Sequence, residues 1–265
     1  MKNHFIFSYS GNKRNEVANL YITAKDIYKF DDAEIIIEPY CGSCAFSYYI
    51  STLYPKKFKY ILNDNDVRLY ELFLLIQNEK EQTINDTLNE LINEFNKYTD
   101  DITRKNYYST IVADKEKNIY SWLFVNKYCT IRKALYPPIT RIKQIKKFKI
   151  EDIPFYNFVK TEKIEFLNCD SLDILKKYKD NDKTIIFLDP PYISSCNSDY
   201  RSPTMSSYEY IFLNNIKYWG SSVICCFENT WIIKLLFKNN TIHTEYNKKY
   251  SNHKKKETTH VVITK

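Results

Sequence analysis

The chain has 265 residues, of which 44% are hydrophobic and 27% are charged, and its formal net charge at pH 7 is +7. This composition is ordinary for a globular protein with a sizeable core, and the positive charge permits a polyanionic partner without demanding one. No apolar run approaches the roughly 20 residues of a membrane span, and the N-terminus lacks a signal-peptide pattern. We therefore expect an intracellular protein that is not secreted. The seven cysteines lack zinc-site spacing, so we expect reduced thiols and no metal.

Buried strands are predicted where short apolar runs end at an acidic residue. The runs cover 34–40, 59–65 and 184–191, and two further strands are predicted at 222–228 and 260–265. The first three place Glu38, Asp64 and Asp189 at their carboxyl ends. Ligands of open α/β sheets bind at that edge, so we expect the site there. Helical periodicity over 16–28, 44–53, 66–78 and 208–219 completes a predicted α/β fold.

The middle of the chain has a different pattern. Residues 82–136 show helical spacing without a convincing strand, and the segment 131–150 is rich in lysine and arginine. We interpret 80–155 as a helical insertion that divides the α/β core into the parts 1–79 and 156–265.

Asp189-Pro190-Pro191-Tyr192 directly follows a predicted buried strand. The two prolines fix the backbone and cannot continue a strand ladder, so the turn is rigid. It holds the Asp189 carboxylate, the Pro190 carbonyl and the Tyr192 ring around one small volume. Two acceptors and an aromatic face suit a planar group that bears an NH2. The alternative is a strand-ending turn with Tyr192 in the core. Because a carboxylate at a strand end adds little to the core, we expect the Asp189 side chain to contribute little to the fold.

Three other short motifs carry candidate binding residues. Gly42, in the segment 38–42, lets the backbone approach a ligand between a strand and a helix. Asp64, after the next strand, can bind ribose hydroxyls. Lys13, after the turn Tyr9-Ser10-Gly11-Asn12, can meet a carboxylate or a phosphate. The segment around Gly42 is neither a GxGxxG motif nor a P-loop. The alternatives for Asp64 and Lys13 are a solvated strand end and a surface loop, respectively.

In order and spacing these four motifs resemble those of the Dam-type DNA adenine-N6 methyltransferases (D12 class, alpha group), and most closely those of bacteriophage Dam proteins. The resemblance runs along nearly the whole chain, and 247–264 is similar to the basic loop and closing strand of phage members. It implies a Rossmann-like S-adenosylmethionine-dependent methyltransferase core with a DNA target-recognition domain at 80–155. It also implies methyl transfer to the N6 amine of an adenine flipped out of double-stranded DNA, as in restriction-modification. The likeness to phage members further implies a location in the cytoplasm of a prokaryote or a virus-infected host cell.

The resemblance also implies roles for individual residues. Contacts to S-adenosyl-L-methionine fall on Tyr9, Ser10, Gly11, Lys13, Glu38, Pro39, Tyr40, Gly42, Asp64, Asp170 and Asp189. The catalytic turn comprises Asp189 and Pro190, which hold the adenine amine, Pro191, and Tyr192, which stacks on the base. DNA contacts fall on Tyr128 as a wedge, Arg132 as a base reader, and Lys133, Arg141, Lys248 and Lys249.

Two departures from the family pattern leave alternatives open. Cys44 stands where many members have glycine, and 126–132 matches the recognition stretch of the family only loosely. These departures motivate one alternative, a catalytically degenerate nucleic-acid binder. A second alternative keeps the chemistry but changes the substrate, an RNA exocyclic-amine methyltransferase. For the leading hypothesis we expect a monomer or weak dimer that acts without a metal or a membrane.

Overall fold

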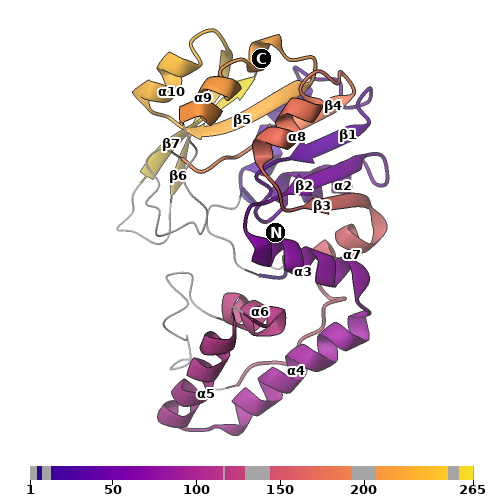
Figure 1. The fold of residues 1–265 in the computed structure, drawn as a ribbon, viewed down its shortest axis with the longest axis vertical. Helices are drawn as coiled ribbons and strands as arrows, with labels where there is room; N and C mark the ends of the chain where they lie inside the picture. The colour runs from indigo at the N-terminus through magenta and orange to yellow at the C-terminus, as the bar shows by residue number, and fades with distance from the viewer. Residues whose placement is uncertain are drawn as a thin grey trace. The chain divides into compact units, whose positions relative to one another are not determined.

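The computed structural model describes residues 5–7, 13–115, 117–128, 144–192, 207–249 and 257–264 (Figure 1). The chain divides into two compact units. Unit 1 comprises Met1–Gly11 and Arg68–Thr161, and unit 2 comprises Asn12–Val67 and Glu162–Lys265.

Unit 2 contains a seven-stranded sheet with the strand order β3-β2-β1-β4-β5-β7-β6. The strands are β1 (Ile35–Glu38), β2 (Lys59–Asn63), β3 (Lys163–Leu167), β4 (Thr184–Leu188), β5 (Ser222–Glu228), β6 (Thr241–Lys249) and β7 (Glu257–Thr264). Strand β7 pairs antiparallel with β5 and β6, and the other pairings are parallel. The order reverses between β1 and β4, the kind of switch point at which doubly wound sheets bind ligands. The predicted α/β, Rossmann-like fold is confirmed.

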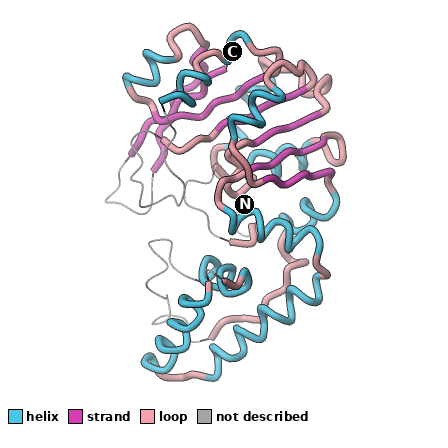
Figure 2. The backbone as a smooth tube through the Cα atoms, viewed as in Figure 1, coloured by secondary structure: helices cyan, strands magenta, loops and turns pink. Residues whose placement is uncertain are grey.

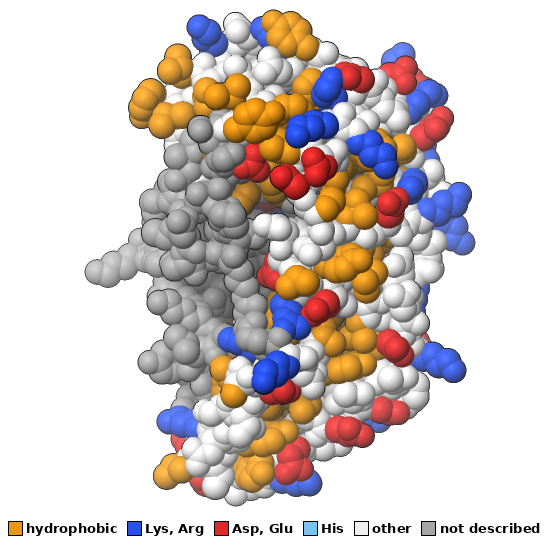
Figure 3. All heavy atoms as spheres, in the orientation of Figure 1, with side chains coloured by type: hydrophobic (Ala, Val, Ile, Leu, Met, Phe, Trp, Pro, Cys, Tyr) orange, Lys and Arg blue, Asp and Glu red, His pale blue; other side chains and the backbone are white. Residues whose placement is uncertain are grey.

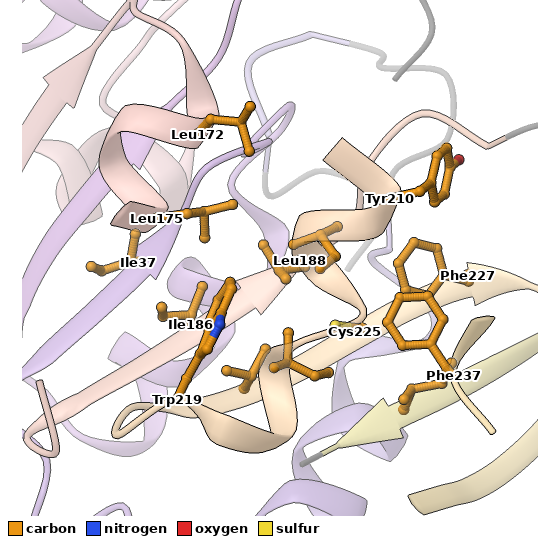
Figure 4. Packing of buried hydrophobic residues seen from close by; sticks show 14 of the residues in the cluster. Ile37, Leu172, Leu175, Ile186, Leu188, Tyr210, Trp219, Cys225, Phe227 and Phe237 are labelled. Carbon is orange, nitrogen blue, oxygen red and sulfur yellow. The ribbon is translucent and has the colours of Figure 1, made fainter. Parts of the chain in front are cut away.

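The apolar run of β4 is explained by burial on both faces of the sheet. Ile186 and Leu188 face a cluster formed with α8 (Ser171–Tyr178) and α9 (Ser207–Leu213) (Figure 4). The intervening Phe187 points to the opposite face, where its ring stacks on Phe46 at 4.4 Å between centroids. A strand covered on both faces needs apolar side chains at every position.

Helices complete unit 2 with α1 (Val17–Lys25), α2 (Ala45–Leu53), the 3₁₀ turn η2 (Ile216–Tyr218) and α10 (Trp231–Leu236). The helix predicted over 208–219 ends at Leu213 and is followed by η2. Strands β3 and β6 were not predicted. Both are edge strands of the sheet, and their polar, partly exposed sequences lack the apolar run of a central strand.

Unit 1 contains the helices α3 (Val67–Asn78, whose first residue belongs to unit 2), α4 (Glu81–Lys97), α5 (Asp101–Asp114), α6 (Ile119–Tyr128) and α7 (Pro154–Thr161). The described residues of unit 1 form helices and no strand (Figure 2). The helical prediction for 82–136 is therefore confirmed over 82–115 and 117–128, and residues 116 and 129–136 lie outside the described residues. The Asp100 side chain caps α5 by accepting from the backbone N–H groups of Ile102 and Thr103. No helix in the described ranges is long and apolar enough to cross a membrane.

Three asparagines of α4 hydrogen-bond to the backbone of the segment 144–150. The Asn89 side chain accepts from the Phe148 N–H at 2.7 Å and donates to the Phe148 carbonyl at 2.9 Å. Asn85 and Asn96 each accept a backbone N–H of the same segment, at 2.8 and 2.9 Å. These side chains satisfy backbone groups that would otherwise be buried without a partner.

We expect Asn89→Ala to lower the free energy of unfolding by about 1–3 kcal/mol, because two buried backbone groups lose their partner. Urea denaturation followed by circular dichroism measures this change. The matched control is Asn93→Ala, on the same helix but exposed, which should leave stability unchanged or slightly raised because alanine favours helix. Equal losses in the two variants would contradict the role of the Asn89 contacts.

Candidate functional site

Lys13, Asp189 and Tyr192 form a hydrogen-bonded cluster, called here the Lys13 cluster. The Lys13 Nζ donates to both Asp189 carboxylate oxygens, at 2.6 and 2.5 Å, and to the Tyr192 hydroxyl at 2.8 Å. The side chains of Lys13 and Asp189 are 4% and 18% exposed. Lys13 lies just before α1, and Asp189 directly follows β4. The structure thus joins two residues that the sequence assigned to separate motifs.

The charge state of Lys13 depends on its partner. Burial by itself lowers the pKa of an ammonium group, but the charge of Asp189 and its hydrogen bond outweigh burial and raise the pKa of Lys13. Removing one partner of such a buried pair costs about 3–5 kcal/mol. The ion pair therefore predicts that the Asp189 carboxylate contributes to stability, in contrast to the expectation from the sequence alone.

The Asp189–Tyr192 turn is held by hydrogen bonds in addition to its two prolines. The Tyr192 hydroxyl lies 3.0 Å from Asp189 Oδ1, to which it can donate, and the Pro191 carbonyl accepts from the Tyr210 hydroxyl at 3.2 Å. Tyr192 is 8% exposed, and its ring meets the ring of His260 edge-on. The tyrosine expected to stack on a base is thus a buried side chain, whose orientation is fixed by a hydrogen bond to Asp189 and a ring contact with His260.

The glycine turn after β1 is joined to Asp64 after β2. The Gly42 N–H donates to Asp64 Oδ2 at 2.8 Å, and the Asp66 N–H donates to the other carboxylate oxygen at 2.9 Å. Burial raises the pKa of Asp64 to about 6 although both hydrogen bonds act in the opposite direction. Gly42 has φ 47°, a left-handed conformation that glycine adopts without steric cost.

Cys44 also has a left-handed backbone, with φ 54° and ψ 33°. This is the position at which the family resemblance expects glycine, and a side chain there costs roughly 1–2 kcal/mol. The residue is fully buried, and burial raises the pKa of its thiol. The left-handed turn is thus present although Cys44 stands at the position of the expected glycine.

Asn63 ties together the ends of three strands, a role that sequence reasoning missed. Its amide nitrogen donates to the carbonyls of Pro39 and Cys169, at 3.0 and 3.1 Å, and its amide oxygen accepts from the Cys169 N–H. The signal in the sequence was an asparagine at the end of an apolar strand.

Asp170 caps α8 by accepting from the Leu172 N–H at 2.8 Å, which accounts structurally for an acid there.

Glu38 and Tyr40 flank Pro39 at the end of β1. Glu38 is buried and accepts from the Ser47 N–H at 2.7 Å, which fixes the first turn of α2. Burial raises the pKa of Glu38 to about 8 against the opposing effect of this hydrogen bond. Tyr40 is half-buried and packs on the core cluster of Figure 4. Burial also raises the pKa of its phenol.

Part of the predicted site lies outside the described residues. This applies to Tyr9, Ser10, Gly11, Arg132, Lys133 and Arg141. The backbones of Lys248 and Lys249 pair with β7 at the end of β6. Tyr128 ends α6 with its half-buried ring 5.1 Å from that of Phe124, between centroids. On the described part of the face that Figure 3 shows, basic and acidic side chains are interspersed.

The described residues contain no group of histidine, cysteine, aspartate or glutamate side chains that could hold a metal ion. The cysteines among them are free thiols: Cys41, Cys44, Cys169, Cys225 and Cys226.

The chain is similar to known proteins in sequence and, separately, to solved structures. The model of the family "D12 class N6 adenine-specific DNA methyltransferase" matches residues 9–245. A relative from Paramecium bursaria Chlorella virus NC1A, described as Type II methyltransferase M.CviBI, is 26% identical over 259 residues, which cover 92% of this chain and 90% of the relative.

Among solved structures, the rRNA methyltransferase aviRa from Streptomyces viridochromogenes matches with a TM-score of 0.42 and 11% identity, over 97% of this chain and 86% of the other. A second structure of that protein gives a TM-score of 0.39 and 12% identity, over 98% and 88%.

The raised pKa of Glu38 predicts a pH dependence of stability. Between its ordinary pKa of 4.5 and about 8, the folded protein holds a proton that the unfolded chain has lost. The contribution of this group to stability therefore falls as the pH rises through that window. At about pH 9 we expect Glu38→Gln to be more stable than the wild type by on the order of a few kcal/mol, with the difference shrinking toward about pH 5.

Urea denaturation across this pH range measures the difference. The matched control is Glu34→Gln, since the Glu34 side chain is exposed and its stability curve should stay parallel to that of the wild type. A Glu38→Gln curve that is also parallel would contradict the assignment.

Proposed function

Because the chain belongs to the D12 class of N6 adenine-specific DNA methyltransferases, we propose that Asp189 and Tyr192 bind its target adenine and that Lys13 helps to bind S-adenosyl-L-methionine. The protein is an enzyme that transfers a methyl group to the N6 amine of adenine in DNA. Its family favours this activity over methylation of RNA and over binding without turnover. What we propose is how the described residues carry the reaction.

The proposed donor site lies at the carboxyl ends of β1, β2 and β4. S-adenosyl-L-methionine, when bound, supplies the methyl group. Asp64 suits the ribose hydroxyls, since its carboxylate is held in place by the Gly42 and Asp66 N–H groups. The Lys13 ammonium suits the carboxylate of the methionine part. We assign the rest of this site to Tyr9, Ser10, Gly11, Glu38, Pro39, Tyr40, Asp170 and Asp189.

The observation that carries the proposal is the Lys13 cluster. Asp189 and Tyr192 there hold a nitrogen that donates hydrogen bonds, as the amine of adenine also does. The ammonium of Lys13 contacts both carboxylate oxygens, so it competes with an adenine amine for Asp189. We infer that Lys13 turns toward the donor carboxylate when donor and DNA bind, and that Asp189 then accepts from the amine.

The Asp189 carboxylate has an electrostatic role in the transfer. As the N6 lone pair forms a bond to the methyl carbon, the bond between that carbon and the donor sulfur breaks and the donor leaves as a neutral thioether. The nitrogen becomes positive, and a fixed carboxylate stabilises that charge until the nitrogen loses a proton to water. The Pro190 carbonyl is the second acceptor for the amine, Pro191 keeps the turn rigid, and the Tyr192 ring stacks on the adenine. The base must leave the duplex to reach these groups, at a cost of a few kcal/mol.

Unit 1 and the basic segments are the proposed DNA contacts. Lysines 146, 147 and 149 are exposed on the segment after α6, where they can neutralise phosphates. We extend this role to Lys133, Arg141, Lys248 and Lys249, with Tyr128 as the wedge and Arg132 as the base reader. We propose a Dam-type, alpha-group enzyme, related to phage Dam proteins, that acts on double-stranded DNA as a monomer or weak dimer.

We expect Asp189→Asn to reduce methyl transfer by on the order of 10²–10³-fold, because the amide keeps the shape of the side chain but loses the charge that stabilises the methylated amine. Incorporation of labelled methyl groups into unmethylated DNA measures the rate. Calorimetric titration with S-adenosyl-L-methionine and thermal unfolding show whether donor binding and the fold survive the loss of the counter-ion of Lys13.

The matched control is Asp182→Asn, an exposed aspartate on the turn before β4, which should retain the wild-type rate. Near-normal transfer by a folded Asp189→Asn enzyme would show that the carboxylate does not act on the amine.

A further inference from the structure

His260 is a buried imidazole that the chemistry proposed above does not use. It lies in β7 and is 0% exposed. Its Nδ1 is 3.3 Å from the Tyr192 hydroxyl oxygen, and the two rings meet edge-on with centroids 5.0 Å apart at 89°. The antiparallel strand β7 thus brings a polar side chain to the ring that is proposed to stack on adenine.

A second tyrosine ring also lies against the imidazole. His260 pairs in register with Tyr246 of β6, and the centroids of their rings are 5.4 Å apart. The Tyr246 hydroxyl is in turn hydrogen-bonded to the Cys226 thiol of β5, with 3.1 Å between oxygen and sulfur. Contacts from two tyrosine rings leave His260 little freedom to turn.

The hydrogen bonds of the Tyr192 hydroxyl show what His260 can do. A phenol has one hydrogen to donate, and its oxygen lies within reach of Lys13, Asp189 and His260. In the proposed reaction Lys13 turns to the methyl donor and Asp189 turns to the adenine amine. The rings of Tyr192 and Tyr246 hold His260 in place, so its Nδ1 can accept the phenol hydrogen once Asp189 has turned to the amine.

We propose that His260 is a positioning residue, which fixes the Tyr192 ring for stacking on the target adenine by accepting the Tyr192 hydroxyl hydrogen at Nδ1. The inference rests on the proposed role of Tyr192. His260 itself touches neither the base nor the methyl donor in this scheme. Its contribution is orientation, which matters because small misplacements of a reacting group lower the rate steeply.

His260→Leu removes the acceptor at similar size. We expect kcat for methyl transfer to unmethylated DNA to fall by on the order of tenfold to a hundredfold. The KM values for DNA and for S-adenosyl-L-methionine should change by less than about twofold, because the lost interaction matters to the transfer step. His260→Asn should keep most of the rate, since an amide oxygen on that side chain can take the place of Nδ1.

The matched control is Val262→Ala, which is buried on the same face of β7. It should lower the midpoint of thermal unfolding and leave kcat near the wild-type value. A drop in kcat for His260→Asn as large as that for His260→Leu would overturn the proposal.

A double-mutant cycle tests whether His260 acts through the Tyr192 hydroxyl. In a Tyr192→Phe background, His260→Leu should cause no further loss of kcat, because the hydroxyl that it positions is already absent. Effects that multiply as if independent would overturn the proposal, as would a wild-type kcat for His260→Leu alone. A wild-type rate for Tyr192→Ala would overturn the role of Tyr192 itself, whereas loss in Tyr192→Ala with a normal His260→Leu enzyme would overturn only this inference.

Discussion

The buried ion pair between Lys13 and Asp189 is the interaction on which the site depends. An ammonium group that is only 4% exposed requires a counter-ion, since an unpaired buried charge costs several kcal/mol. The carboxylate is placed by the end of β4 and the two following prolines, and the lysine by the residues before α1, 176 positions earlier in the chain. One contact therefore joins the start of the chain to the centre of the sheet. Lys13 also donates to the Tyr192 hydroxyl, so Lys13, Asp189 and Tyr192, which all act in the proposed reaction, lie together.

The same carboxyl edge of the sheet holds its other polar groups in place in advance of any ligand contact. Asp64 is bound by two backbone N–H groups, and Asn63 links the ends of β1, β2 and β3. A group that is already oriented loses little freedom on binding, which favours affinity. In the proposed reaction Lys13 exchanges Asp189 for the donor carboxylate, and Asp189 exchanges Lys13 for the adenine amine.

Much of the core and the edge of the site could be predicted from the sequence, because central strands buried on both faces leave continuous apolar runs. Those runs placed Asp64 and Asp189 at strand ends. The edge strands β3 and β6 escaped prediction because one open side permits polar residues. The contacts of Lys13 with Asp189, of His260 with Tyr192 and of Asn89 with Phe148 join distant parts of the chain, and such pairings leave no local pattern. At Cys44 the sequence was misleading in the opposite direction. The absence of glycine there suggested a degenerate cofactor loop, but the backbone of Cys44 still adopts the left-handed conformation.

The exchange of partners by Lys13 is tested most directly by a crystal structure of the enzyme with a non-reactive analogue of S-adenosyl-L-methionine and a duplex that contains its methylation site. We expect the adenine amine at about 3 Å from an Asp189 oxygen, the usual hydrogen-bond distance, and the Lys13 ammonium on the carboxylate of the analogue. An extrahelical adenine stacked elsewhere, with Lys13 still bonded to both oxygens of Asp189, would contradict the exchange.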